Sequence, residues 1–468
     1  MKQLLQRLAN RDRRCLCLFL LVFAALLVRV GIIIHDSTYA RLQESGALWS
    51  QFAPPEQDHF GFGQETGSIA RSIATGKGFS SPFGGDTGPT AWIAPVYPYL
   101  LALIFKLCGV FSQTSAIVIL CLNSVFDAMA CIYIVRIGEK TLGRASGWTA
   151  ALVWAGCFIF ARWATSWVWE TSLSALLLAM VVDQTLELAE QRDTRPWLRY
   201  ALTWGVIALS NPSLLAALPV CSVWVMTKQG IRSRRFWCNA VLASAVFCAL
   251  ITPWLIRNKI VFDRWVFIRS NAGFEFSLGN YAGSNGLGWF GKHPSQNKFQ
   301  WALYKQQGEM AYVAGKKTAT VAWVKQDPAA FIQLSAKRFY DFWYGTILAW
   351  DPYEAWRPWM YYWLSLMSMA GLWLAMRRGS RPGLFLAGLI VFTPLPYYFT
   401  FTNPRYRHPI EPLMLIAASY LVIVPVEAIR RWRNKSTVGG VAADLPLTVT
   451  QSLDDADLQP VGEPTSVS

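Results

Sequence analysis

The sequence predicts an all-α polytopic membrane protein, a bundle of about ten transmembrane helices joined by outer loops. Of its 468 residues, 53% are hydrophobic and only 15% are charged, whereas a soluble domain carries about 25% charged residues. Apolar stretches of span length recur along the chain, and short clusters of Lys and Arg separate them. The 23 Trp residues suit the headgroup zone of a bilayer, where an amphipathic ring is favoured.

The apolar stretches give the predicted spans in order. The first resembles a signal peptide, but it is span-length and lacks a small-x-small cleavage site, so we expect a retained helix. The fifth and sixth spans are short. Asn211-Pro212 separates them, since the residue before a proline resists a helical conformation. The spans are expected near 16–34, 114–137, 145–163, 168–188, 197–211, 213–227, 236–256, 359–376, 383–402 and 411–429.

The basic clusters predict the orientation of the chain in the membrane. Lys and Arg mark the cytoplasmic ends of spans, and with ten spans every cluster falls on one side: those at 2–14, 136–144, 192–199, 228–235, 377–381 and 430–435. Both termini are then cytoplasmic, and the protein is expected to be integral to the cytoplasmic (inner) membrane. The apolar run Ala94–Val110 would invert all later clusters if it crossed. It is short and contains Pro95, Pro98 and Lys106, so we interpret it as an in-plane or re-entrant helix on the outer side.

This topology divides the chain into segments. The net charge of +15 is explained by topology-determining residues rather than by nucleic acid binding. The nine Cys residues lie almost entirely in apolar spans, so no disulfide framework is expected. The predicted segments are a basic cytoplasmic N-terminus at 1–15, a transmembrane bundle at 16–256 that includes a first extracytoplasmic loop at 35–113, a large extracytoplasmic loop at 257–358, C-terminal transmembrane helices at 359–429 and a disordered cytoplasmic tail at 430–468.

Two isolated glutamates fall on the outer face. A carboxylate at the edge of a membrane is costly, so its position is a functional clue. Glu65 precedes apolar residues at helical spacing, and Glu170 lies beside Trp167 and Trp169 at the start of the fourth span. The alternative for both is an ordinary glutamate at a helix start, where the helix dipole favours negative charge.

Cationic residues also gather on the outer side. The turn FTNPRYRHPIEP places Arg405, Arg407 and His408 there, against the positive-inside trend. Guanidinium groups bind phosphate through two parallel hydrogen bonds, so this turn is a candidate phosphate site. The alternative is anchoring to phospholipid headgroups.

The large outer loop contains candidate sugar-binding residues. Arg257, Arg269, Asn280 and His293 are placed on a backbone rich in glycine and aromatic residues, and a sugar site combines ring faces with polar groups. A lone histidine such as His293 is more often a loop hydrogen-bonding residue than a ligand. No metal-ligand spacing, Walker A sequence or nucleophile-elbow motif occurs in the sequence.

Several segments resemble GT-C glycosyltransferases, the polyprenyl-phosphate-sugar-dependent membrane enzymes related to protein O-mannosyltransferases and aminoarabinose transferases. Glu65-x-x-x-x-Ala70-Arg71, with the following Gly-Lys-Gly-Phe and PVYPYLLALIFKLCG, is similar to their first outer loop. WETSLSALLL, TPWLIRN and NPRYRHPIEPLMLIAASYL are similar to later segments. The resemblance covers roughly residues 10–430.

The resemblance implies transfer of a sugar from a polyprenyl-phosphate donor to an acceptor hydroxyl, with inversion. The family's catalytic acid maps to Glu65 and its second acidic site to Glu170. Many members have Asp in place of Glu65, often beside a second acid, whereas the nearest acids here are Asp58 and Asp86. The partners implied are the donor, an acceptor whose type the sequence does not identify, and membrane lipids. No redox cofactor is implied, and dependence on a divalent metal is left open.

The residues indicate how this chemistry would work. We expect surrounding Trp and Phe side chains to raise the pKa of Glu65, which would make it a better general base. Arg405 and Arg407, with Arg257 or Arg269, would stabilise the leaving phosphate.

Two other functions remain open from the sequence. A transporter or flippase for lipid-linked sugars needs broken or polar helices near mid-membrane and often an inverted repeat, and Asn211-Pro212 is one such break without a counterpart in the second half. A non-catalytic membrane assembly subunit would keep the fold without the activity.

Overall fold

The computed structural model describes residues 2–44, 60–288, 290–345 and 357–441. Throughout these ranges the regular structure is helical, and the only β-type pairings within them are two isolated bridges, Ser80 with Pro89 and Leu287 with Thr402. The chain divides into two compact units, residues 1–423 and residues 424–468. The predicted all-α class is therefore confirmed, and the description below concerns the first unit.

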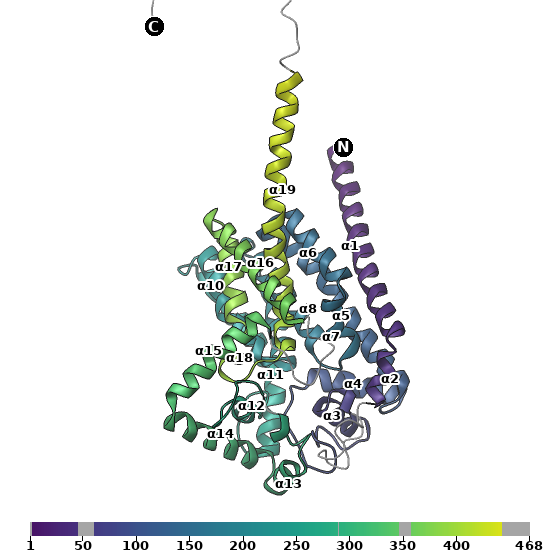
Figure 1. Cartoon of the computed structure of the whole chain (residues 1–468), viewed down its shortest axis with the longest axis vertical. Coiled ribbons are helices and arrows are strands. Elements are labelled where there is room, and N and C mark those ends of the chain that lie inside the picture. Colours follow the sequence, from purple (N-terminus) through teal and green to yellow (C-terminus); the bar gives the residue numbers. More distant parts are fainter. Residues whose placement is uncertain (1, 45–59, 289, 346–356, 442–468) are drawn as a thin grey trace, which may run out of the picture. The chain divides into compact units, whose positions relative to one another are not determined.

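The elements before the large loop form most of the helical bundle (Figure 1). Helices α5, α6 and α8 pack against one another, α1 packs against α5, and α9 packs against α8 and α11. In order, the elements are α1 (Lys2–His35), α2 (Thr38–Glu44), η1 (Phe60–Phe62), α3 (Glu65–Ala74), α4 (Val96–Cys108), α5 (Gln113–Thr141), α6 (Arg144–Gly156), α7 (Phe158–Ser166), α8 (Thr171–Glu190), α9 (Thr194–Ser210), η2 (Pro212–Ala217), α10 (Leu218–Gln229) and α11 (Arg234–Phe262).

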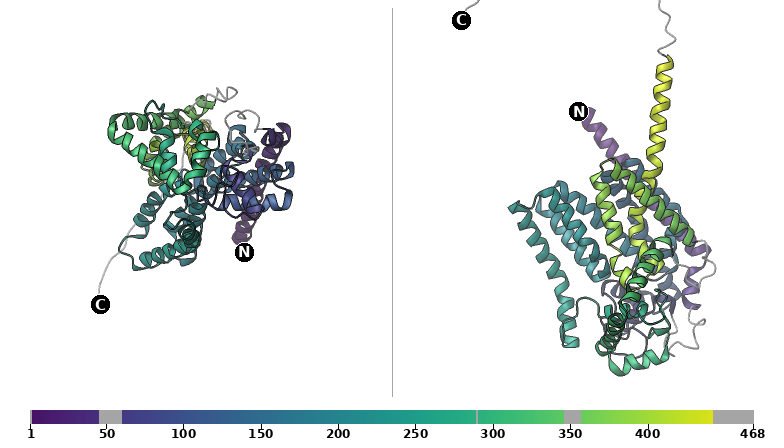
Figure 2. Two further views of the ribbon diagram at one scale, coloured as in Figure 1. Left: turned by 90° about the horizontal axis from the view of Figure 1, so that it is seen from below. Right: turned by 60° about the vertical axis from the view of Figure 1, so that its left-hand side comes forward.

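The later elements include a helical outer region and the last bundle helices. They are α12 (Ala272–Gly279), η3 (Phe290–Lys292), α13 (Lys298–Gln307), α14 (Glu309–Gln326), α15 (Pro328–Tyr344), α16 (Arg357–Arg377), α17 (Arg381–Phe392), α18 (Leu395–Phe399), η5 (Pro404–Ile410) and α19 (Glu411–Val441). Seen from below, the N-terminal, teal and green helices occupy different sectors (Figure 2, left). The described part of the large loop predicted at 257–358 is built mainly from helices α12–α15.

Every predicted span coincides with helix, although not every one is a long apolar helix. Six helices or helical stretches of the described residues are long and apolar enough to cross a membrane: Asp12–His35, Gln113–Thr141, Thr171–Glu190, Arg234–Phe262, Arg381–Phe399 and Pro404–Arg430. The other predicted spans correspond to α6 with α7, to α9, to η2 with α10 and to α16, which are shorter, interrupted or less apolar. The protein is a multi-pass membrane protein.

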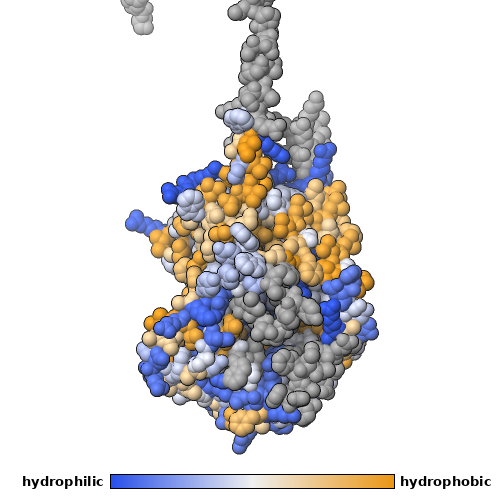
Figure 3. All heavy atoms as spheres, viewed as in Figure 1, coloured by the Kyte–Doolittle hydropathy of each residue, from blue (hydrophilic) through white to orange (hydrophobic). Residues whose placement is uncertain are grey.

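The surface of the bundle fits a lipid environment. Large apolar side chains on α1 and α11 are exposed, for example Phe19 and Val241. In the view of Figure 3, hydrophobic surface forms a band across the bundle, whereas the surface over α13 and α14 is mainly hydrophilic. An apolar surface of this extent is unfavourable in water and favourable against acyl chains.

The run Ala94–Val110 forms the short helix α4, which packs against α3. Thirteen residues span about 20 Å at the α-helical rise, less than the ~30 Å hydrocarbon core of a bilayer. The helix ends at Gly109, whose φ of 95° is accessible mainly to glycine. This length supports the in-plane interpretation, which stays a prediction.

Two terminal predictions are affected by the structure. Residues 430–441 were predicted to belong to a disordered tail, but α19 is helical to Val441. The remainder of that tail, residues 442–468, lies outside the described residues, as does Asp58 of the first loop.

Candidate active site

The start of α3 brings Glu65 to His293. The chain turns tightly before the helix, where Gly63 and Gln64 both have positive φ, and a Cβ on Gly63 would lie 2.2 Å from the carbonyl oxygen of Val168. Glu65 is 6% exposed, and its Oε1 lies 3.0 Å from Nε2 of His293. Its Oε2 is buried and has no hydrogen-bond partner among the described residues. The carboxylate therefore pairs with a residue 228 positions away in the chain (293 minus 65) and has one oxygen available to a ligand.

The surroundings of His293 determine its tautomer. The backbone N–H of Ser295 donates to Nδ1 at 3.2 Å, so Nδ1 carries a lone pair and Nε2 is the nitrogen that donates to Glu65. The Ser295 hydroxyl lies 2.6 Å from Nδ1. The rings of Phe83 and Phe274 pack edge-on against the imidazole at 5.4 and 5.2 Å between centroids. These contacts hold the imidazole in one orientation.

The pKa of Glu65 is lowered, so the raised pKa predicted from the sequence is wrong. Burial alone would raise the pKa of this carboxyl, but the hydrogen bond from His293 and the positive potential of His293 and Arg405 outweigh burial. Glu65 is consequently an ionised carboxylate at neutral pH.

Arg405 supplies positive charge to the same region. It is half-buried in η5, and its guanidinium carbon lies 3.9 Å from the ring centre of Trp169. It is within electrostatic reach of Glu65 and Glu170. Among the described residues no carboxylate lies within ion-pair distance of Arg405. A cation that stacks on an indole and has no described carboxylate within ion-pair distance suits an anionic ligand.

Glu170 lies beside this cation. It occupies the position before α8, half-buried, and its side chain makes no capping hydrogen bond. Glu170 therefore stands at a helix start, as the alternative expected, but it does not cap the helix through its side chain. The neighbouring rings of Tyr397 and Tyr406 are stacked at 4.1 Å. Glu65, Glu170 and Arg405 thus belong to one electrostatic cluster, although they lie far apart in the sequence.

Arg269 joins the cluster together with an acid that the sequence analysis missed. Arg269 donates from Nε to the Trp92 carbonyl at 3.1 Å, and its Nη2 lies 4.0 Å from Oε1 of Glu275. Burial raises the pKa of Glu275, and Arg269 and His293 offset part of that rise. The only available signal was an isolated acid in the aromatic segment FEFSLG.

Arg257 and Asn280, both predicted to bind substrate, have protein partners. Arg257 donates to the carbonyls of Thr90 and Phe79 at 2.6 and 2.9 Å. Asn280 donates to the carbonyls of Phe276 and Phe399 and accepts from Arg338. These contacts join segments that are distant in the chain, and the predicted role of both residues in substrate binding stays a prediction.

Glu309 is a second acid that the sequence analysis missed, and it also connects segments that are distant in the chain. Glu309 of α14 is buried, and its carboxylate accepts from Ser270 Oγ at 2.6 Å, from the Ala91 backbone N–H at 2.8 Å, from Tyr304 and from Thr90. Burial raises its pKa, although these four donors favour the charged form. The first outer loop and the large outer loop are therefore fastened together.

Arg407 and His408 are buried and have protein partners, and their predicted role in phosphate binding stays a prediction. Arg407 is buried and donates to the Trp343 and Tyr361 carbonyls and to Ser365 Oγ. His408 is buried within the bundle, with Nε2 3.1 Å from Asp127 and Nδ1 3.0 Å from Glu411.

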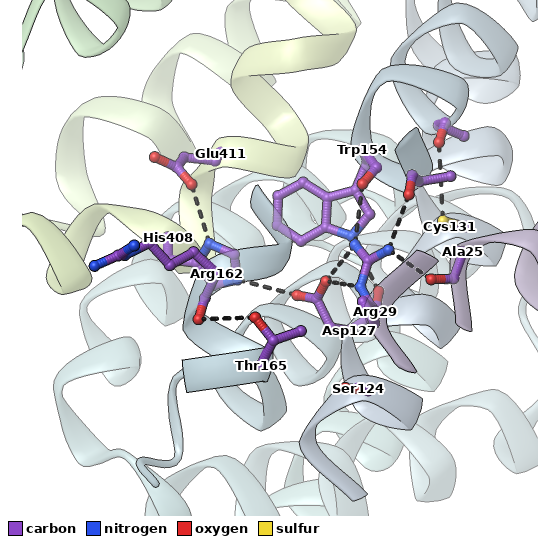
Figure 4. Close-up of polar contacts among 12 residues, drawn as sticks. Ala25, Arg29, Ser124, Asp127, Cys131, Trp154, Arg162, Thr165, His408 and Glu411 are labelled. Carbon is purple, nitrogen blue, oxygen red and sulfur yellow. Dashed lines mark hydrogen bonds and ion pairs between the residues drawn. The ribbon is translucent and has the colours of Figure 1, made fainter. Parts of the chain in front are cut away.

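Figure 4 shows the inner polar cluster that contains His408. Asp127 of α5 accepts from Nε of Arg29 at 2.7 Å, and Arg29 of α1 also donates to the carbonyls of Ala25, Trp154 and Ala155. The indole of Trp154 stacks on His408 at 4.9 Å between ring centroids. Each of these charged groups has a protein partner, which fits a structural connection between helices.

A divalent metal would need several ligands gathered at one place. Among residues 2–44, 60–288, 290–345 and 357–441, no group of three or more His, Cys, Asp and Glu side chains is placed to hold a metal ion. Glu65 and His293 offer two ligand types of the required chemistry, and a third would have to come from a substrate or from outside these ranges.

Comparisons with known proteins bear on the fold. No protein-family model and no curated protein matches the chain. Two crystal structures of the Archaeoglobus fulgidus oligosaccharyltransferase are similar. The complex with Zn and sulfate is 14% identical with a TM-score of 0.50 over 91% of this chain and 51% of that chain. The apo form is 12% identical with a TM-score of 0.50 over 90% and 52%.

The apo crystal structure of ArnT from Cupriavidus metallidurans also matches, at 11% identity with a TM-score of 0.43 over 83% of this chain and 58% of that chain. This chain spans about half the length of the oligosaccharyltransferase chains. At these identities the likeness to the oligosaccharyltransferase structures concerns the fold alone, and it confirms the all-α polytopic membrane fold predicted from the sequence.

Proposed function

We propose that this GT-C-like bundle is a glycosyltransferase that moves a sugar from a polyprenyl-phosphate donor to an acceptor hydroxyl on the extracytoplasmic face. The observation that carries the proposal is the buried Oε2 of Glu65, which has no hydrogen-bond partner within the described part of the chain. The carboxylate lies within electrostatic reach of Arg405. A hydroxyl nucleophile requires a carboxylate oxygen that is not already hydrogen-bonded, and a phosphate leaving group requires a cation that forms no close ion pair.

The reaction is a single displacement at the anomeric carbon. The acceptor oxygen forms the new bond to C1, the bond between C1 and the phosphate oxygen breaks, and its electron pair leaves with the phosphate. The acceptor proton passes to Oε2 of Glu65 while His293 holds Oε1 at 3.0 Å. One displacement inverts the anomeric configuration. A carboxylate of lowered pKa is a weak base, so proton transfer comes late, once the hydroxyl has become acidic through bonding to C1.

Positive charge stabilises the departing phosphate. Arg405 is the principal candidate, because it is half-buried and rigidly stacked on Trp169. Arg269, 4.0 Å from Glu275, is the second. Preorganised cations of this kind stabilise charge that develops in the transition state without reorganising at the moment of reaction.

The proposed orientation follows from the charge pattern and from the contacts between outer loops. The basic clusters place both termini in the cytoplasm of the cell that carries this inner-membrane protein. Ala91 and Glu309 are hydrogen-bonded, so the number of crossings between them is even. Six predicted spans, from 114–137 to 236–256, lie between them. A crossing by α4 would make the number odd, which supports an in-plane α4.

Substitution of Glu65 tests the proposal. The purified protein in lipid would be given a panel of polyprenyl-phosphate sugars, and release of polyprenyl phosphate would be measured. Glu65→Gln should lower the rate by about 10²- to 10⁴-fold, the usual contribution of a general base, while inserting normally. The control is Asp86→Asn, an exposed acid of the same loop paired with Lys77, which should turn over at the wild-type rate. Wild-type turnover by Glu65→Gln would instead support a non-catalytic assembly subunit or a transporter.

A further inference from the structure

A pocket of about 270 Å³ lies in the outer region, between α12, α13 and α14. Its walls include the rings of Phe274, Tyr281 and Trp323, and its polar groups include Lys292, Lys316 and Gln300. The proposed transfer reaction does not use it. Pockets for drug-sized ligands measure about 300–1,000 Å³, so this one suits a small ligand such as a single substituted sugar ring.

The pocket carries positive charge. None of its lining residues is acidic. The ammonium of Lys316 donates to Oε1 of Gln300 at 2.7 Å, which is a neutral acceptor, and the ammonium of Lys292 lies 3.4 Å from the centre of the Tyr281 ring. Burial lowers the pKa of both lysines, and the charge of Lys292 lowers that of Lys316 further. Two ammonium groups that line one pocket without an acidic lining residue suit an anion placed between them.

The pocket adjoins the candidate active site. Phe274 lines the pocket, and its ring lies 5.2 Å from that of His293, the partner of Glu65. Lys292 is also the residue directly before His293 in the chain. Phe274 therefore connects the pocket to His293, the hydrogen-bond partner of the proposed general base.

We propose that this pocket binds an acidic sugar unit of the acceptor, with its carboxylate or phosphate on Lys292 and Lys316 and its ring against Tyr281 or Trp323. The assignment rests on the proposed function, because it places a second sugar ring beside the base that activates the acceptor hydroxyl. Aromatic faces bind the apolar faces of sugars, and ammonium groups select the charge.

Direct binding of small sugars tests this inference. The full chain in nanodiscs of zwitterionic lipid would be titrated with glucuronate, glucose 6-phosphate and glucose, followed by saturation-transfer NMR. The two charged sugars should bind at least about tenfold more tightly than glucose, since a charge-assisted contact contributes a factor of that order. Comparison of glucuronate with glucose 6-phosphate shows which anion is preferred. Added salt should weaken both.

Lysine variants give the matched comparison. Lys292→Gln with Lys316→Gln should abolish the preference for charged sugars, whereas Lys317→Gln, which removes an exposed charge next along α14 and outside the pocket, should leave it unchanged. Equal binding of glucose and glucuronate, or an equal loss in Lys317→Gln, would overturn the inference. So would binding of acetate or inorganic phosphate as tight as that of the charged sugars, because the ring would then contribute nothing.

The Glu65→Gln variant separates this inference from the proposed function. Glu65 does not line the pocket, so charged sugars should bind this variant as tightly as they bind the wild type, even though transfer is lost. If the wild-type protein binds charged sugars but transfers no sugar, the proposed function and the acceptor role are contradicted. The pocket would then still be a site for acidic sugars. Transfer without binding would contradict this inference alone.

Discussion

At the residue scale, the ionisation of Glu65 depends mainly on its neighbour His293. The carboxylate is buried, and burial by itself raises the pKa of an acid. Its hydrogen bond to His293 is the largest opposing effect, and the pKa is lowered below its ordinary 4.5 as a result. Glu65 therefore stabilises the fold above its ordinary pKa, and that contribution is lost as the pH falls through the lowered pKa.

Removal of His293 should move the acidic limb of the activity profile. In His293→Ala the burial of Glu65 is no longer offset by the hydrogen bond, so its pKa should rise above 4.5, and transfer should decline at a higher pH than in the wild type. The measurement is kcat/KM for the donor against pH. His35→Ala, which changes an exposed histidine, serves as the control. An acidic limb that does not move would show that Glu65 is not the titrating base.

The residues of the cluster could be predicted only in part. Glu65, His293, Arg269 and Arg405 are residue types that stand out on the predicted outer face, and the structure places them together. Arg405 and Arg407 lie two residues apart in one short 3₁₀ helix, yet the first reaches the cluster and the second is used by carbonyls of the bundle. Sequence spacing cannot separate these directions, because they depend on tertiary packing around the turn.

At the element scale, α5 and α6 approach closely where both have glycine. A Cβ on Gly138 would lie 2.2 Å from the Cα of Gly147, and a backbone atom cannot move aside as a flexible side chain can. Contact through glycine lets two helices pack at short range inside a membrane.

Replacement of Gly138 should therefore destabilise this helix pair. We expect Gly138→Ala to lower the free energy of unfolding by about 1–3 kcal/mol, as overpacking does, and to lower the melting temperature in detergent. Gly156→Ala at the end of α6, where an added Cβ meets nothing within 4 Å, should have little effect. Equal melting temperatures for Gly138→Ala and the wild type would mean that the helices are further apart than described.

The pairing of Arg29 with Asp127 connects α1 to α5 inside the bundle. Both side chains are fully buried. Breaking a buried ion pair from one side leaves the other charge unpaired, so Asp127→Asn should destabilise the protein by about 3–5 kcal/mol.

A double-mutant cycle with Arg29→Met measures the coupling between the two residues. Thermal denaturation in detergent should show the double variant to be more stable than Asp127→Asn alone. Asp263→Asn, which changes a fully exposed acid, is the control. Additive losses from the two substitutions would show that the pair is not coupled.

Helix positions were predictable to a greater degree than helix details. Apolar runs between basic clusters coincide with helices throughout the bundle, because span length and hydrophobicity determine them directly. The break between α6 and α7 at Cys157 and the continuation of α11 to Phe262 were not foreseen, since nothing in the local sequence marks either.

At the scale of the whole molecule, the contacts between the two outer loops restrict the topology. Because α4 is expected to lie in plane, positions before and after it should face the same side of the membrane. In a background without the nine native cysteines, Asp86→Cys and Val110→Cys should both react with an impermeant maleimide from the outer side. Arg232→Cys should react only after permeabilisation. Labelling of the first two positions from opposite sides would show that α4 crosses.

The most direct measurement of the central claim is a cryo-EM structure of the full chain in nanodiscs with polyprenyl phosphate, the product of donor cleavage. The account predicts phosphate density against the guanidinium of Arg405, in the same cavity as Oε2 of Glu65. Phosphate density at the opposite leaflet, beside the basic residues that follow α16, or density separated from Glu65 by packed helices, would contradict it.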